Sequence, residues 1–218
     1  MKNELAKVRN NVRNNLQAVR SMHPLSVREK TSDGFITYDI YSRLLKDRVV
    51  YLDEDFNDRT SSLVISQLLY LDAVSLEEIT IYINSPGGSV TAGLAIYDTM
   101  NQLKSPVNTI GLGMCASMGC FLVSAGDKGR RRILPSTRIM MHQVSSGTQG
   151  TIQDMKVAMA NSDYLNEFLY TAMALHCDKD KETLKKDSER DKWMSAKEAV
   201  DYGLADEVMK PAPGKWGA

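Results

Sequence analysis

The sequence contains few of the residues that bind metals or form disulfide bonds. It has three cysteines and three histidines in 218 residues. Cys115, Cys120 and Cys177 cannot all pair with one another, so we expect unbridged thiols in a reducing compartment. No further Cys or His completes a metal site around Cys115 and Cys120. We therefore expect neither a metal nor another cofactor.

Net charge and long apolar runs are also absent. Lys and Arg number 27 and so do Asp and Glu, so charge gives no reason to expect nucleic acid or an anionic membrane as the main partner. No stretch approaches the roughly 20 apolar residues that cross a bilayer. The phosphate-loop pattern Gly-x-x-x-x-Gly-Lys-Ser/Thr does not occur either. The composition suits one compact domain, which we expect in the cytoplasm.

One serine stands where a nucleophile is often exposed. Ser117 follows an apolar, strand-like run at 107–112 and opens a helix-like run at 117–125. Free backbone N–H groups at a helix start can stabilise the anionic intermediate of acyl transfer. The alternative is an ordinary helix N-cap, which is the commoner role of a serine in this position.

Of the three histidines, His142 is the best candidate for a base. It ends the strand-like run 138–141, where a side chain reaches the edge of an α/β sheet. His23 precedes a proline in a polar segment, and His176 ends a long helical pattern, where a side chain that can be cationic is common. An acid that orients His142 is also needed. Asp191 lies in a charged break between two short helical segments, which by composition alone is a solvated loop.

The chain closely resembles ClpP, the proteolytic subunit of the Clp protease, over about residues 35–209. Several blocks match in the same order: 38–45, 82–88, 91–93, 96–100, 116–119, 138–143, 189–191 and 195–204. The resemblance implies that Ser117 is the nucleophile, His142 the general base and Asp191 the orienting acid. The order Ser, His, Asp differs from that of α/β-hydrolases, and Cys115 stands where their nucleophile motif requires glycine.

A second motif, Pro86-Gly87-Gly88, lies between a strand-like run and a helix-like run. By itself it predicts a turn, although glycines also allow backbone N–H groups to approach a substrate closely. The resemblance implies that the N–H groups of Gly88 and Met118 form the oxyanion hole. Two such donors contribute about 2.7–4 kcal/mol each to transition-state stabilisation.

Strand and helix signals alternate along the chain, which predicts an α/β fold with parallel strands and right-handed crossovers. The expected strands are 48–52, 78–84, 107–111, 131–134 and 138–142, and the expected helices are 58–71, 89–103 and 151–175. The resemblance specifies the crotonase-like superhelix of ββα units, in which the helix at 151–175 projects as a handle.

The handle helix has more apolar side chains than a small domain needs to expose, so we expect a partner helix against it, although it could instead fold back on its own core. These residues are Ile152, Met155, Met159, Leu165, Phe168, Leu169 and Met173. The resemblance implies two stacked heptameric rings of this chain, a tetradecamer that encloses the active sites. It further implies that Arg190 couples ring contacts to the catalytic arrangement, and that an ATP-driven unfoldase delivers unfolded proteins.

Docking of the unfoldase is where the chain departs from its relatives. The resemblance places the docking cleft at Thr80, Tyr82, Gln102, Ile110, Leu112, Arg132, Leu134 and Met209. Thr80, Gln102 and Arg132 stand where well-known bacterial members carry aromatic residues. We therefore expect weak binding to a standard bacterial unfoldase, and either a partner with different loops or a second type of ring.

The domain limits are expected at 28–209, with an N-terminal extension before them and a tail at 210–218. Residues 1–20 have apolar residues at helical spacing among basic ones, which predicts a short amphipathic helix. The resemblance favours a propeptide over an organelle transit peptide. Two other functions stay open: an inactive scaffold subunit of a mixed ring, and a crotonase-type acyl-CoA enzyme that would use backbone oxyanion donors without a Ser–His pair.

Overall fold

The computed structural model describes residues 26–145, 147 and 149–215 of the protein. The predicted α/β class is confirmed, because these residues form a sheet of mainly parallel strands accompanied by seven helices. They divide into two compact units between Asp47 and Arg48. The amphipathic segment predicted at 1–20 lies outside the described residues.

The smaller unit is a β-hairpin followed by a short helix, and the sequence did not predict it. Strands β1 (Ser26–Thr31) and β2 (Gly34–Asp39) pair antiparallel across a two-residue turn. Helix α2 (Ile40–Lys46) begins at Asp39, whose carboxylate accepts a hydrogen bond from the Ser42 amide at 2.9 Å. An ion pair between Glu29 and Arg43 joins the hairpin to this helix.

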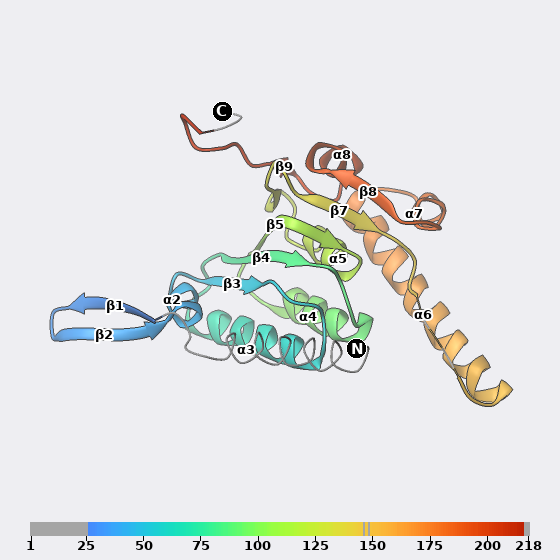
Figure 1. Ribbon diagram of the computed structural model, residues 1–218, viewed down its shortest axis with the longest axis horizontal. Coiled ribbons are helices and arrows are strands. Elements are labelled where there is room, and N and C mark those ends of the chain that lie inside the picture. The colour runs from blue at the N-terminus through green and yellow to red at the C-terminus, as the bar shows by residue number, and fades with distance from the viewer. Residues whose placement is uncertain (1–25, 146, 148, 216–218) are drawn as a thin grey trace, which may run out of the picture. The chain divides into compact units, whose positions relative to one another are not determined.

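The larger unit is built on a seven-stranded sheet, shown in Figure 1. Its strands are β3 (Val49–Leu52), β4 (Ile79–Ser85), β5 (Val107–Ala116), β6 (Arg131–Ile133), β7 (Arg138–Met141), β8 (Lys192–Ser195) and β9 (Glu207–Val208). The order is β3-β4-β5-β6-β9, and β7 pairs with both β5 and β8. All of these pairs are parallel except β7 with β8. The long strand β5 pairs with β6 through its first half and with β7 through its second.

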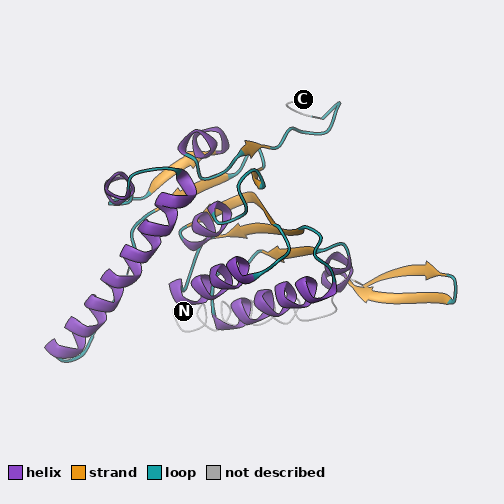
Figure 2. Cartoon of the chain, turned by 180° about the vertical axis from the view of Figure 1, so that it is seen from behind, coloured by secondary structure: helices purple, strands orange, loops and turns teal. Residues whose placement is uncertain are grey.

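One face of this sheet is covered by helices (Figure 2). These are α3 (Asp58–Val74), α4 (Val90–Gln102) and α5 (Met118–Ser124). Alternate residues of β4, namely Ile79, Ile81 and Ile83, are fully buried on that side. This period of two is typical of a strand that has one face in the core.

Three further helices follow β7. The long helix α6 (Ile152–Cys177) begins with a capping box formed by Thr151 and Asp154, and Figure 1 shows it extending beyond the sheet. Then come α7 (Lys181–Asp187) and α8 (Ala196–Tyr202). A helix was predicted at 151–175, and the structure confirms it.

Most predicted elements agree with the structure to within a few residues, but two details were wrong. Residues 192–195 are the antiparallel strand β8, where the sequence suggested a break leading into a helix. Strand β5 continues to Ala116 beyond the predicted end at 111. In the described part of the chain, no helix is long and apolar enough to cross a membrane.

Candidate active site

Ser117 lies at a sharp turn between β5 and α5. Its backbone has φ 54° and ψ −120°, a region that residues other than glycine seldom adopt. Its amide donates a hydrogen bond to the carbonyl of Met140 on β7 at 2.8 Å. The sequence lacks the glycine two positions before the serine, yet the strained strand-to-helix turn associated with exposed nucleophiles is present.

His142 is brought to Ser117 by the pairing of β5 with β7. Ala116 and Met140 are partners in this parallel pair, so the residues just beyond the two strands leave the sheet side by side. The imidazole Nε2 of His142 lies 2.9 Å from Ser117 Oγ. This is a hydrogen-bonding distance at which an imidazole can remove the hydroxyl proton.

Asp191 is placed by the antiparallel pairing of β7 with β8. Met141 is paired with Lys192, so the next position along each strand sets His142 opposite Asp191. Asp191 Oδ1 lies 3.4 Å from His142 Nδ1, slightly beyond the usual limit of about 3.2 Å for such a hydrogen bond. A proton on Nδ1, facing the carboxylate, leaves Nε2 free to accept the proton of Ser117.

Two backbone amides border the same space. Gly88 and Met118 line a pocket together with Ser117 and His142. Neither amide takes part in a backbone hydrogen bond of the described residues. A side chain at Gly87 would collide with Ser117, and one at Gly88 would lie 2.5 Å from the Phe56 carbonyl oxygen. These close approaches explain the two glycines, because this loop fits against its neighbours only without side chains.

Beyond the amides, the pocket has a mainly apolar wall. Helix α5 provides Phe121, and α6 provides Leu169, Tyr170 and Met173. Leu169 and Met173 were assigned from the sequence to a surface for a partner helix, but in the structure they line this pocket. The base of α6 therefore folds back on its own unit, whereas Ile152 and Met159 farther along the helix are exposed.

The sequence analysis missed two residues that hold the segment carrying His142. Asn166 on α6 accepts a hydrogen bond from the Val144 amide at 2.8 Å. The carbonyl of Ser188, just after α7, accepts one from the Gln143 amide at 2.9 Å. No local pattern identifies either residue, because both act across more than 20 positions of sequence.

The residues of the expected docking cleft lie mainly on the face of the sheet opposite α3 and α4. Thr80 and Tyr82 on β4, Ile110 on β5 and Arg132 on β6 share that face by strand register. A row of polar contacts crosses it. Glu207 pairs with Arg132 at 2.8 Å, Arg132 contacts Asn108 at 3.4 Å, and Asn108 donates to Thr80 at 3.1 Å.

The other predicted cleft residues are distributed along the same strands and beyond them. Leu112 lies on β5, Leu134 directly follows β6, Met209 directly follows β9, and Gln102 is the last residue of α4. The amides of Leu134 and Met209 donate to the carbonyls of Gly111 and Ile133, which continues the parallel pairing past the strand ends.

Other polar residues lie away from the pocket. Arg190 is exposed on the loop beside Asp191.

The three cysteines are buried, and burial raises the pKa of Cys115 to about 12. His176 is not a cationic helix cap. Burial, with a smaller effect from the charge of Arg131, lowers its pKa to about 4, so it is neutral at pH 7.

The chain was compared with models of known protein families. The family model described as Clp protease matches residues 31–212. The match covers most of the chain, including Ser117, His142, Asp191 and both glycines of the loop before α4.

Proposed function

This chain belongs to the Clp protease family, and we propose that it is a serine endopeptidase in which Ser117 attacks the peptide bond. The observation that carries the proposal is the 2.9 Å contact between Ser117 Oγ and His142 Nε2. A hydroxyl and an imidazole at this distance, with a carboxylate on the far side of the ring, form the arrangement that activates a serine nucleophile.

In the proposed reaction, His142 accepts the Ser117 proton as Oγ bonds to the substrate carbonyl carbon. The carbonyl oxygen becomes an oxyanion, which the amides of Gly88 and Met118 stabilise. Protonated His142 then gives its proton to the departing amine, the carbon–nitrogen bond breaks, and an acyl-enzyme remains. Water, deprotonated by His142, attacks the ester carbon and releases the new carboxyl terminus and Ser117. Asp191 stabilises the imidazolium at each stage.

The pocket suits one substrate side chain beside the bond that is cut. Its wall of Phe121, Leu169 and Met173 offers contacts to an apolar group within reach of Ser117. Burial of such a group contributes roughly 1.5–3 kcal/mol. We therefore expect preference for an apolar residue on the acyl side of the cleaved bond.

Labelling with a fluorophosphonate probe tests this proposal. The intact protein should react at Ser117 and hydrolyse short apolar peptides, whereas Ser117→Ala should do neither. His142→Ala should lose activity to a similar degree, about 10⁴-fold or more, because the two residues act as a unit. Ser145→Ala, which changes another serine of the same pocket, is the control and should be labelled normally.

The outcome also distinguishes the proposed peptidase from both alternative functions. An inactive scaffold subunit would leave Ser117 unlabelled, and so would an acyl-CoA enzyme that works through backbone amides alone. Appreciable peptide hydrolysis by Ser117→Ala, with assembly intact, would contradict the assignment of the nucleophile.

Enclosure in two stacked rings and supply of unfolded chains by an ATP-driven unfoldase complete the proposal. The polar row from Glu207 to Thr80 supports the expectation of weak docking for a standard bacterial unfoldase, because apolar loops would have to cover charged groups there. The rate of ATP-dependent degradation of a tagged folded protein, with a common bacterial unfoldase, measures this docking. Gln102→Phe combined with Arg132→Phe should increase the degradation rate. Efficient degradation by the unmodified protein would contradict the expectation of weak docking.

A further inference from the structure

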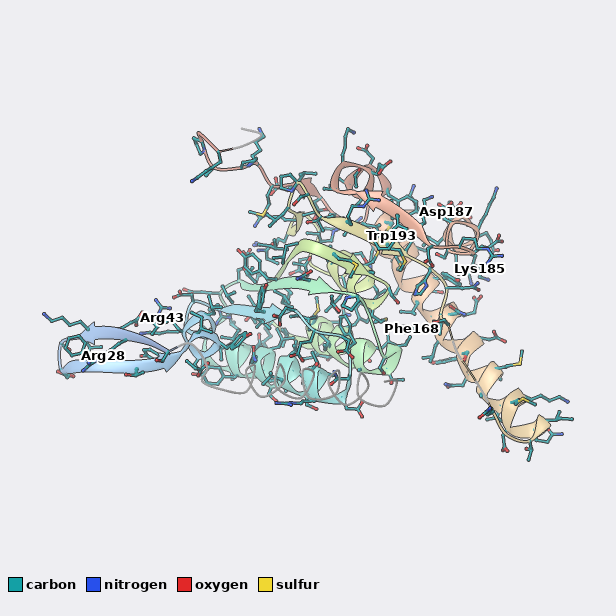
Figure 3. All side chains as sticks on the ribbon, viewed as in Figure 1. Arg28, Arg43, Phe168, Lys185, Asp187 and Trp193 are labelled. Carbon is teal, nitrogen blue, oxygen red and sulfur yellow. The ribbon has the colours of Figure 1, made fainter. Side chains whose placement is uncertain are left out.

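The loop that carries Asp191 is closed by an ion pair across its neck. Asp187 is the last residue of α7, and Lys192 is the first residue of β8. Lys192 Nζ lies 2.9 Å from Asp187 Oδ2, so the two ends of the loop are joined directly through their side chains. Figure 3 labels Asp187 beside the end of α7 and Trp193 on the adjoining β8.

A third element supports this ion pair. Tyr202, the last residue of α8, donates its hydroxyl to Asp187 Oδ2 at 2.8 Å. The Lys192 ammonium also lies 4.9 Å from the centre of the Tyr202 ring, a cation–π distance. The carboxylate, the ammonium and the phenol therefore satisfy one another.

Their protonation states agree with these contacts. The hydrogen bond from Lys192 is the largest influence on Asp187 and lowers the pKa of its carboxyl. Burial, followed by the bond to Asp187, raises the pKa of Tyr202, so the phenol keeps the proton that it donates. Asp187 is thus a charged acceptor for two donors at neutral pH.

Asp191 itself has little to hold it. Its side chain is 60% exposed, and its carboxylate approaches His142 Nδ1 at 3.4 Å. Its neighbour Lys192, in contrast, is fixed both by its side chain and by pairing with Met141, the residue before His142. At the other end, Ser188 next to Asp187 accepts the Gln143 amide.

We propose that Asp187 and Lys192, supported by Tyr202, form a clamp that positions Asp191 against His142. The inference rests on the proposed serine peptidase function, since it assigns a role within that site. These residues do not touch substrate, so they are positioning residues. They act on the rate only through the placement of the Asp191 carboxylate.

The test compares Lys192→Met with Lys179→Met. Lys179 Nζ lies 4.5 Å from the same Tyr202 ring but outside the loop, so its removal takes away equal charge and a similar ring contact without opening the neck. Lys192→Met should lower kcat and the rate of fluorophosphonate labelling by up to about 10²-fold, the order expected when a catalytic group is displaced by about 1 Å, with KM little changed. Lys179→Met should keep the rate of the intact protein, and Lys192→Arg should recover most of it.

A second background distinguishes positioning from general stabilisation. In Asp191→Asn, adding Lys192→Met should cause no further loss, because the clamp has no carboxylate left to position. An equal additional loss in that background, or an undiminished rate for Lys192→Met alone, would overturn the clamp. If Lys192→Met fails to fold, the isosteric Asp187→Asn takes its place in the same comparison.

The proposed function can fail separately. If Ser117→Ala retained activity and labelling, the site assignment would be wrong whatever Lys192→Met did. If Ser117→Ala and Asp191→Asn both lose activity while the clamp variants do not, the site assignment holds and the clamp is wrong.

Discussion

The two sides of the candidate triad are held by different means. Ser117 opens α5, whose seven residues are all buried. Asp191 lies 60% exposed in a loop whose neck is joined by a partly exposed ion pair. The proposed nucleophile is therefore fixed by packing, whereas the proposed acid is fixed by polar contacts for which water and salt compete.

The difference sets how each side can be disturbed. Displacing a buried helix costs packing along its whole length, because protein interiors have few voids that could absorb the shift. A partly exposed ion pair contributes only about 0–1 kcal/mol to folding. Changes near Ser117 should thus affect activity and stability together, while changes near Asp191 should affect activity alone.

Among substitutions that leave the candidate triad itself unchanged, we expect the largest effect from Gly119→Ala, which would disturb the buried side. A methyl group at Gly119 would lie 2.8 Å from the carbonyl oxygen of Ser85 at the end of β4. Relief of that contact must move α5 away from β4, and with it the Met118 amide relative to Gly88. Loss of one well-placed oxyanion donor lowers kcat by about 10²–10³-fold. Peptide hydrolysis and thermal unfolding should both show the change.

Two control substitutions sharpen the comparison. At Gly93 on α4, a methyl group would meet the flexible end of the Met118 side chain, which can rotate away, so Gly93→Ala should cost far less. Glu189→Ala, on the exposed loop, should leave the unfolding temperature unchanged. Normal activity and stability in Gly119→Ala would show that the buried side is less rigid than its packing indicates.

The buried side was also the more predictable one. The strands and helices around Ser117 were predicted from apolar runs, because a strand or helix that packs into the core has a regular spacing of apolar residues in its own sequence. The end of β5 was misplaced because Gly111 and Gly113 resemble a break, yet the strand continues through Gly113 with φ 60°. No side chain fits at Gly113, because an added methyl group would lie 2.6 Å from the side-chain oxygen of Asn84.

The exposed side was not predictable from local sequence. Strand β8 has four residues, and its pairing partner β7 lies about 50 positions earlier in the chain. The local sequence around Asp191 indicates a solvated loop, and only the resemblance to ClpP implies a catalytic role for it. Asp187, Lys192 and Tyr202 come from three elements, so their meeting is a result of the tertiary fold.

The last expected effect, on stability rather than on rate, concerns the base of α6. Ser124 Oγ donates to the Phe121 carbonyl at 2.7 Å, so it accepts from His176 Nδ1 at 3.0 Å. His176 Nε2 then faces the Tyr97 hydroxyl at 3.3 Å as an acceptor. The neutral ring satisfies both contacts, and a second proton would be added close to Arg131, whose guanidinium bonds the His176 carbonyl at 2.7 Å.

The sign of the pH dependence follows from the lowered pKa. Above pH 6.5 the ring is neutral in the folded and unfolded chains, and its contribution to stability is fully present. As the pH falls from 6.5 to about 4, His176 binds a proton in the unfolded chain but stays neutral in the folded chain, so the free energy of unfolding decreases. The whole loss corresponds to about 3 kcal/mol.

His176→Asn keeps a donor near Ser124 without a titratable ring, so its unfolding free energy should fall less over this range than that of the intact protein. Denaturant unfolding at pH 7 and pH 4.5 measures the difference, and parallel losses in the two proteins would show that His176 is not part of the buried side.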